Sequence, residues 1–186
     1  MADMTRTGST QTRTTLEEFK SLPESLDHIE LIDGELIMSP APKYLHQNAV
    51  GNTFFELRKL PQGKVVVSPM DVYLDDENVL QPDVFWVSGA DSLCKLGEDG
   101  YWHGAPDLVV EVLSPSTARR DHSVKFALYA RFGTREYWLL DPEGEFVEVF
   151  RRENDLLVRF GVFGIGENFA LSVLPEISIS VSTLFE

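Results

Sequence analysis

The chain has 186 residues, 43% of them hydrophobic, and a formal net charge of −14. That length supports one ordinary domain with its own core, and no apolar stretch approaches the roughly 20 residues that cross a bilayer, so we expect no membrane span. DNA binding depends on neutralising phosphates with Lys and Arg. The charge therefore argues against a broad, tight DNA footprint, although a locally basic groove is compatible with it.

The N-terminus, the cysteine and the histidines bear on domain organisation, redox compartment and zinc binding. Residues 1–13 are polar, rich in Thr and without the apolar segment of a signal peptide, so we predict a disordered tail before a single domain over 14–186. Cys94 is the one cysteine, which rules out an internal disulfide framework and fits a reducing cytoplasm. The four histidines show no close metal-ligand spacing, which argues against zinc.

The first third of the chain predicts two helices and a hairpin. A threonine at 14 or 15 followed by two acidic residues predicts a short capped helix over 16–19. The dipeptide Asp33-Gly34 between apolar runs over 29–32 and 35–38 is a strong hairpin signal, because both turn positions favour positive φ. Apolar residues at helical spacing predict a helix over 44–60.

The rest of the chain is mainly strands. Apolar, β-branched runs predict strands over 65–67, 71–74, 81–87, 105–114, 135–140, 145–151 and 156–160. A helix over 121–132 is predicted to end at Gly133, and with the strands on either side it forms a βαβ candidate. These elements predict an α+β fold with a central mixed sheet flanked by helices.

Two acids lie within the apolar runs, Asp83 in one predicted strand and Glu111 in another. Burying an unpaired charge is costly, so an acid in such a strand usually has a cation, a metal or a basic side chain as its partner. Two such strands side by side could hold one divalent ion, as in a metal-dependent phosphodiesterase. The alternative is that one or both acids lie at strand ends in contact with solvent.

Two positions on the Glu111 strand bear on this hypothesis. Asp107 shares a face with Glu111 but lies about 13 Å away along the strand, so one ion cannot readily bind both, and a structural or capping role is favoured. Position 113 shares that face about 6.6 Å from Glu111, where many nucleases carry a lysine beside the metal. Here it is Leu113, so the cation comes from elsewhere or the site is inactive.

Lys125 is the candidate substitute. If Asp121 caps the helix, Lys125 lies in its first turn, one position off an apolar stripe of Val124, Leu128 and Phe132. A lysine stem is long enough to reach back over the sheet towards Glu111. The alternative is an ordinary solvated helix lysine.

With these residues in place, the chain resembles the Uma-type family of putative restriction endonucleases, a branch of the PD-(D/E)XK nuclease superfamily. The resemblance covers residues 14–185, nearly the whole chain, in the order of the family. The matching stretches are LIDGEL at 31–36, SPAP at 39–42, His46-Gln47, QPD at 81–83, PDLVVEVLSPST at 106–117, then Asp121, Lys125, Tyr129, Gly133 and EYW at 136–138.

The resemblance implies a restriction-endonuclease-like fold and assigns roles to residues. Asp83 is similar to the Pro-Asp aspartate of the superfamily, Glu111 to its second acid, and Lys125 to a lysine that the family places on the following helix. The resemblance further implies an auxiliary acid at Glu35 and pocket positions at His46 and Gln81. The alternatives for these three are a solvated hairpin acid, an N-terminal helix residue and a polar group at a strand edge.

The resulting hypothesis is a Mg²⁺-dependent endonuclease in which Asp83 and Glu111, with Glu35 as a further metal ligand, bind one Mg²⁺ or Mn²⁺. DNA is the expected substrate, RNA stays open, and the resemblance implies 5′-phosphate products. A twofold homodimer is expected, with Phe160, Phe163 and Phe185 as candidate interface residues. The alternative function is a non-hydrolytic binding or assembly module, which the charge and Leu113 favour.

Overall fold

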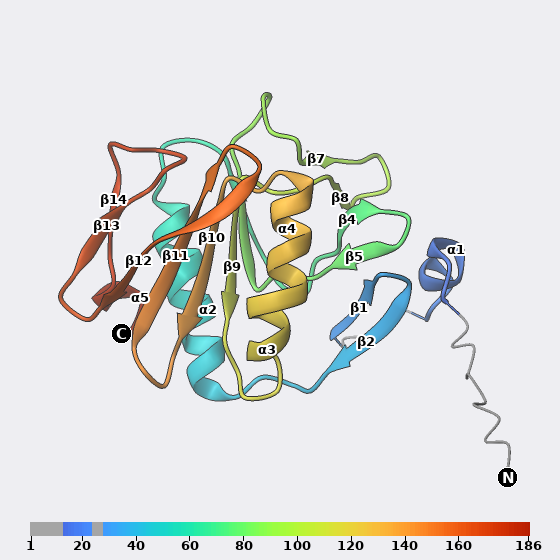
Figure 1. The fold of residues 1–186 in the computed structure, drawn as a ribbon, viewed down its shortest axis with the longest axis horizontal. Helices are drawn as coiled ribbons and strands as arrows, with labels where there is room; N and C mark the ends of the chain where they lie inside the picture. Colours follow the sequence, from blue (N-terminus) through green and yellow to red (C-terminus); the bar gives the residue numbers. More distant parts are fainter. Residues whose placement is uncertain (1–12, 24–27) are drawn as a thin grey trace, which may run out of the picture.

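The computed structural model describes residues 13–23 and 28–186 (Figure 1). The predicted disordered tail lies outside these residues except for Arg13, whose guanidinium is 3.2 Å from the Glu77 carboxylate. That residues 14–186 form a single domain stays a prediction. None of the helices in the described ranges is long and apolar enough to cross a membrane.

The centre of the molecule is a six-stranded mixed sheet that confirms the predicted α+β class. Its strands, in the order β12-β11-β10-β9-β6-β3, are β3 (Lys64–Val67), β6 (Val84–Val87), β9 (Leu108–Val112), β10 (Glu136–Asp141), β11 (Phe146–Glu153) and β12 (Leu156–Gly164). β9 and β10 are parallel, and the other neighbours are antiparallel. A helical segment connects β9 to β10, which confirms the βαβ unit.

A second sheet has the order β2-β1-β5-β4-β8-β7. Its strands are β1 (His28–Ile32), β2 (Glu35–Ser39), β4 (Val72–Asp75), β5 (Asn78–Leu80), β7 (Lys95–Leu96) and β8 (Trp102–His103). The predicted hairpin is confirmed, because Asp33 and Gly34 have φ of 49° and 76° between β1 and β2. The predicted strand over 81–87 is shorter than expected, because residues 81–83 form the connection from β5 in this sheet to β6 in the central one.

Helices and the second sheet cover the two faces of the central sheet (Figure 1). On one face, α2 (Tyr44–Arg58) packs against alternate strand residues such as Trp86 and Trp138. On the other, α4 (Phe126–Phe132) and the second sheet pack against Phe85 and Tyr137. A strand covered on both faces is apolar at successive positions, which explains the fully buried run of β9.

The remaining elements are short. They are α1 (Leu16–Lys20), the hairpin of β13 (Asn168–Ala170) and β14 (Ser178–Ser180), and α5 (Ser182–Phe185). The predicted threonine cap of α1 is Thr15, which forms a capping box with Glu18. Phe163 and Phe185 are partly buried against the α2 side of the core, whereas Phe160 is 50% exposed on β12, so of the three aromatics considered for an interface it is the most accessible.

The helical segment after β9 differs from the prediction at its start. It begins at α3 (Ala118–Arg120), continues through the π-helical turn η1 (Asp121–Lys125) and then becomes α4, so Asp121 lies inside the helix instead of capping it. Val124 is 39% exposed and Lys125 is 3% exposed. Lys125 is therefore the more buried of the two, although Val124 was expected on the buried stripe. The segment ends at Gly133 with φ of 102°, as predicted.

Candidate active site

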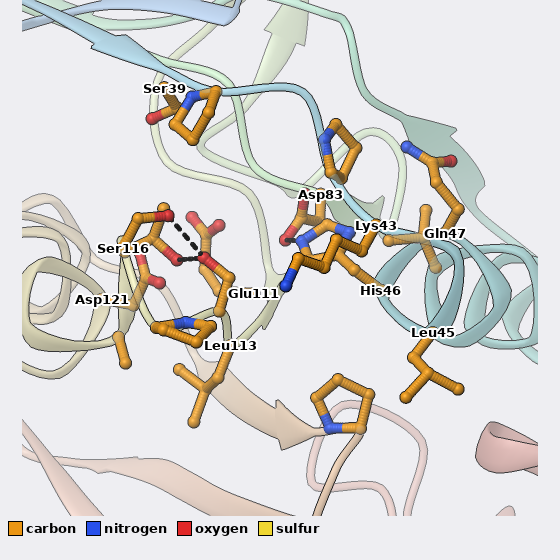
Figure 2. A pocket seen from close by; sticks show the side chains of 18 of the residues that line it. Ser39, Lys43, Leu45, His46, Gln47, Asp83, Glu111, Leu113, Ser116 and Asp121 are labelled. Carbon is orange, nitrogen blue, oxygen red and sulfur yellow. Dashed lines mark hydrogen bonds and ion pairs between the residues drawn. The ribbon is translucent and has the colours of Figure 1, made fainter.

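A cleft of about 800 Å³ opens at one end of the central sheet. Three segments form most of its walls. They are residues 39–47, from the end of β2 into α2, residues 113–118, from the end of β9 to the start of α3, and residues 141–143 after β10. Asp83, Glu111, Asp121, Lys125 and His46 all line this cleft. Figure 2 shows the carboxylates of Asp83 and Glu111 directed into the same space from neighbouring strands.

Asp83 lies immediately before β6, at the strand end nearest the cleft. The antiparallel register pairs Val84 with Val110 and Phe85 with Val109, so continuing it by one residue places Asp83 opposite Glu111. Asp83 is at a strand end, as one alternative proposed, but it is only 8% exposed. It is therefore not the solvated acid that this alternative required. Its Oδ2 accepts a hydrogen bond from the Val112 backbone N–H at 2.7 Å, which fixes the carboxylate.

Glu111 lies in β9 and is 2% exposed. Its Oε1 accepts hydrogen bonds from Lys125 Nζ at 3.0 Å and from the Tyr129 hydroxyl at 3.4 Å. Burial raises the pKa of Glu111 well above its usual value, and the carboxylates of Asp121 and Asp83 raise it further, although Lys125 acts in the opposite direction. Burial and the neighbouring carboxylates therefore oppose the charged form of Glu111, which Lys125 favours.

Lys125 lies among three carboxylates. Its Nζ is 3.0 Å from Glu111 Oε1, 2.9 Å from Glu30 Oε1 and 3.8 Å from Asp121 Oδ1. Burial alone lowers the pKa of a lysine, but these carboxylates outweigh it and raise the pKa of Lys125 above its ordinary value. Lys125 therefore contacts Glu111, as predicted, and is not a solvated helix lysine.

Asp121 and Lys125 are four residues apart and therefore share a face of the helical segment, and both lie in the π-helical turn η1. Such turns occur as single bulges in α-helices, frequently at functional sites. Asp121 is 2% exposed, and its Oδ1 has no hydrogen-bond partner among the described residues. Burial raises the pKa of Asp121. The sequence pattern assigned Asp121 to a cap, so its place in this cluster was not anticipated.

Glu30, and not Glu35, is the hairpin acid in this cluster. Glu35 is exposed on the edge strand β2, at the turn end of the hairpin, and does not line the cleft. Glu30 is fully buried in β1. Although burial raises its pKa, Lys125, His28 and the Gln81 N–H hold the pKa of Glu30 below its usual range. The signal for Glu30 was present in the sequence, since it is an acid inside the apolar run over 29–32.

His46 and Gln81 both contact the acids, in different ways. His46 is in the first turn of α2 and lines the cleft, with Nε2 3.3 Å from Asp83 Oδ2. Burial lowers the pKa of His46, but Asp83 outweighs it, so that the pKa is raised. Gln81 does not line the cleft. Its backbone N–H donates to Glu30 Oε1 at 2.9 Å, so it supports the cluster from behind.

Asp107 and Leu113 lie where the strand geometry predicted. Asp107 precedes β9 at the end away from Glu111, and its Oδ2 accepts a hydrogen bond from the Ser88 N–H at 2.8 Å, which is a structural contact. Leu113 lines the cleft as an apolar wall residue. The position that carries a lysine in many nucleases is thus apolar here, and Lys125 places an ammonium beside Glu111 from the helix.

A profile of the Uma2 family, described as putative restriction endonuclease, matches residues 16–182. The chain belongs to the Uma2 family. No curated protein matches it significantly. Among solved structures it is similar to the crystal structure of a putative nuclease belonging to DUF820 from Anabaena variabilis, with a TM-score of 0.74 and 22% identity over 92% of this chain and 97% of the other. That likeness confirms the restriction-endonuclease-like fold.

In this Uma2 chain the acids fit a divalent ion that keeps part of its water shell. Across residues 13–23 and 28–186, no group of three or more His, Cys, Asp and Glu side chains forms a ready cage for a metal. Mg²⁺ does not require one, since it usually binds through one or two carboxylates and several waters. Within the same ranges, the hydrogen bonds and ion pairs of Asp83 and Glu111 involve Oδ2 and Oε1, so Oδ1 and Oε2 are available.

The charge balance of the Uma2 cluster also fits a cation. The cluster holds four buried carboxylates and one lysine; the carboxylates are Glu30, Asp83, Glu111 and Asp121. Burial raises the pKa values of Glu111 and Asp121 most, and the neighbouring carboxylates raise them further. A divalent ion would relieve this excess of negative charge.

Proposed function

We propose that the chain is a Mg²⁺-dependent endonuclease that hydrolyses phosphodiester bonds of DNA, with Mn²⁺ able to replace Mg²⁺. The observation that carries the proposal is the position of Lys125, whose ammonium is 3.0 Å from Glu111 in the cleft that also holds Asp83. Two carboxylates and a lysine are the groups that metal-assisted phosphodiester hydrolysis requires. Membership of the Uma2 family supports the same class of reaction.

Asp83 and Glu111 would hold the ion through their available oxygens. When bound, such an ion lowers the pKa of a coordinated water and polarises the phosphate. The Val112 N–H and His46 hold Oδ2 of Asp83, and Oδ1 is the oxygen that we propose as the metal ligand. Hydrogen bonds that orient a ligand carboxylate in this way strengthen metal binding.

Lys125 would supply a fixed positive charge where negative charge develops on the phosphate. A preorganised cation in a site that excludes water stabilises such charge more than it would in bulk solvent. Glu30 and Asp121 keep Lys125 protonated and aimed at Glu111. Leu113 is then no obstacle to activity, because the helix provides the charge.

The experiment is relaxation of supercoiled plasmid with Mg²⁺ or Mn²⁺, run beside Asp83→Asn and Lys125→Met proteins purified identically. We expect relaxation by the parent, and a rate about 10²–10³-fold lower for Lys125→Met. Equal relaxation by all three would indicate a contaminant or a different site. No relaxation by the parent, together with no divalent-dependent thermal shift, would favour a non-hydrolytic binding module. Circular dichroism verifies that each variant is folded.

We also propose a twofold homodimer in a reducing cytoplasm. The edge strand β12 exposes Leu156, Val158, Phe160 and Val162, and unpaired apolar edges pair readily with another chain. The buried thiol of Cys94 is compatible with a reducing compartment. Light scattering at two protein concentrations tests the dimer, and a monomer at both would refute it.

A further inference from the structure

We infer that the cleft binds a single strand of nucleic acid, with its bases unstacked, in preference to a duplex. This inference rests on the proposed nuclease function and names its substrate class. It is drawn from the size of the cleft, the chemistry of its walls and the charges at its rim.

The cleft has the size of a small-ligand site. Its volume of about 800 Å³ lies within the roughly 300–1,000 Å³ of pockets that enclose a small molecule. Specific protein–DNA interfaces instead bury on the order of 1,000–2,500 Å² of strongly positive surface. The candidate catalytic groups line the cleft, so the scissile bond has to enter it.

Apolar side chains form much of the wall. Pro42, Leu45, Leu113 and Pro115 all line the cleft, and Figure 2 shows Leu45 and Leu113 on opposite sides of it. Apolar surface gains free energy by covering other apolar surface. A duplex hides the faces of its bases and offers only phosphates, sugars and groove edges, whereas an unpaired strand can place base faces against such walls.

An exposed aromatic ring lies at the cleft. Tyr44 is the first residue of α2, lines the cleft and is 76% exposed. Aromatic side chains of this kind are stacking platforms for unpaired bases, each changing affinity by about tenfold or more. A base-paired substrate cannot use this ring without opening.

Among the described residues, the Lys and Arg side chains that line the cleft are Lys43 and Lys125. Lys43 extends its side chain into the cleft (Figure 2), and Arg120 Nη1 contacts Oγ of the lining residue Ser39 at 3.2 Å. Asp141 and Glu143 also line the cleft. These few cations suit one strand, because a duplex would bring a second row of phosphates to a cleft that also holds acids. The net charge of −14 opposes any wider phosphate contact.

The test is fluorescence anisotropy in EDTA with three labelled probes: oligothymidylate, the oligothymidylate–oligoadenylate duplex, and oligouridylate. We expect oligothymidylate or oligouridylate to bind at least about tenfold more tightly than the duplex, and the comparison of these two shows whether a DNA or an RNA strand is preferred. Two phosphate contacts predict a slope of about −1.4 for log K against log salt. Equal or tighter duplex binding, or a slope steeper than about −4, would overturn the inference.

Matched tyrosine variants locate the binding. Tyr44→Ala should weaken single-strand binding about tenfold, whereas Tyr44→Phe should retain it. Tyr101→Ala is the control, since Tyr101 is 41% exposed and does not line the cleft. An unchanged affinity in Tyr44→Ala would refute the stacking role. Metal-dependent plasmid relaxation without a preference for single strands would refute this inference alone. If the protein neither cleaves the plasmid nor binds any probe, the proposed function is refuted as well.

Discussion

The Nζ atom of Lys125 lies 3.0 Å from Oε1 of Glu111, although the two residues are 14 positions apart and belong to a helical segment and a strand. The same ammonium is 2.9 Å from Glu30 on the first hairpin. Three separate parts of the chain thus meet at one buried cation. This meeting point is the centre of the proposed site, and its stability and its chemistry depend on the same contacts.

Replacing Lys125 with Met should destabilise the fold as well as the reaction. Removing one partner of a buried ion pair leaves uncompensated charge and costs about 3–5 kcal/mol, which urea unfolding would measure. Lys59→Met is the control, because Lys59 pairs with Glu56 at the surface and should change the free energy of unfolding by less than about 1 kcal/mol. A loss below that value for Lys125→Met would contradict the charged cluster. Adding Glu30→Gln should recover part of the stability.

The two hairpin glutamates should behave differently. Glu30→Gln removes a carboxylate in contact with Lys125 and should lower the cleavage rate about 10–100-fold, as for other groups that orient a site from behind. Glu35→Gln changes an exposed side chain away from the cleft and should leave the rate unchanged. Initial rates of plasmid relaxation measure both. A larger loss in Glu35→Gln would show that the cleft residues are misassigned.

Two aspartates at opposite ends of the β6–β9 pair should separate metal binding from stability. Asp83→Asn should weaken Mn²⁺ binding strongly, because it removes a ligand charge while retaining an acceptor for the Val112 N–H. Asp107→Ala should leave Mn²⁺ affinity unchanged and cost about 1–3 kcal/mol, because it removes the acceptor of the Ser88 N–H. Calorimetric titration and urea unfolding measure the two effects. Similar Mn²⁺ affinities for both variants would contradict the role of Asp83.

The pH dependence of stability follows from the acids whose pKa is raised. Burial raises the pKa of Glu111 and Asp121 above the unfolded values of 4.5 and 3.8, so over that range the folded state holds more protons than the unfolded state. The stability of the metal-free protein should therefore fall as pH rises from about 4.5 through the native pKa values. His46, whose pKa is also raised, adds to the fall near neutrality.

Divalent ions should reverse this trend, because they compete with protons for the same carboxylates. Urea unfolding at about pH 5 and pH 8, with and without Mn²⁺, should show the larger Mn²⁺ stabilisation at the higher pH. Glu111→Gln should flatten the fall in the metal-free protein and abolish the Mn²⁺ effect. A metal-free stability that rises between these pH values and is unaffected by Glu111→Gln would contradict the assignment.

Local signals predicted most of the fold correctly. The turn at Asp33-Gly34, the threonine cap at Thr15 and the stop at Gly133 depend on residues that are neighbours in sequence. Each of these three features can be read from a short window of the chain. Two acids in apolar runs made a shared site of Asp83 and Glu111 one of two alternatives, because a buried acid needs a partner, and the β6–β9 register brings the two residues together.

Features that depend on tertiary packing could not be predicted from the sequence pattern. In the π-helical turn Lys125 is buried and Val124 is exposed, and no local residue preference indicates such a turn. Glu30 carried the same signal as Glu111, but its contact with Lys125 depends on how the hairpin packs against the helix. Glu35 was favoured by resemblance alone, and its place on an edge strand puts it outside the cluster.

The central claim is that Asp83 and Glu111 bind one divalent ion next to Lys125. The most direct measurement is anomalous diffraction from crystals grown with Mn²⁺. We expect one strong peak within coordination distance of both carboxylates, about 2.0–2.6 Å from a ligand oxygen, and no peak there in crystals of Asp83→Asn. A saturated crystal with no peak at these acids, or with a peak only elsewhere, would contradict it.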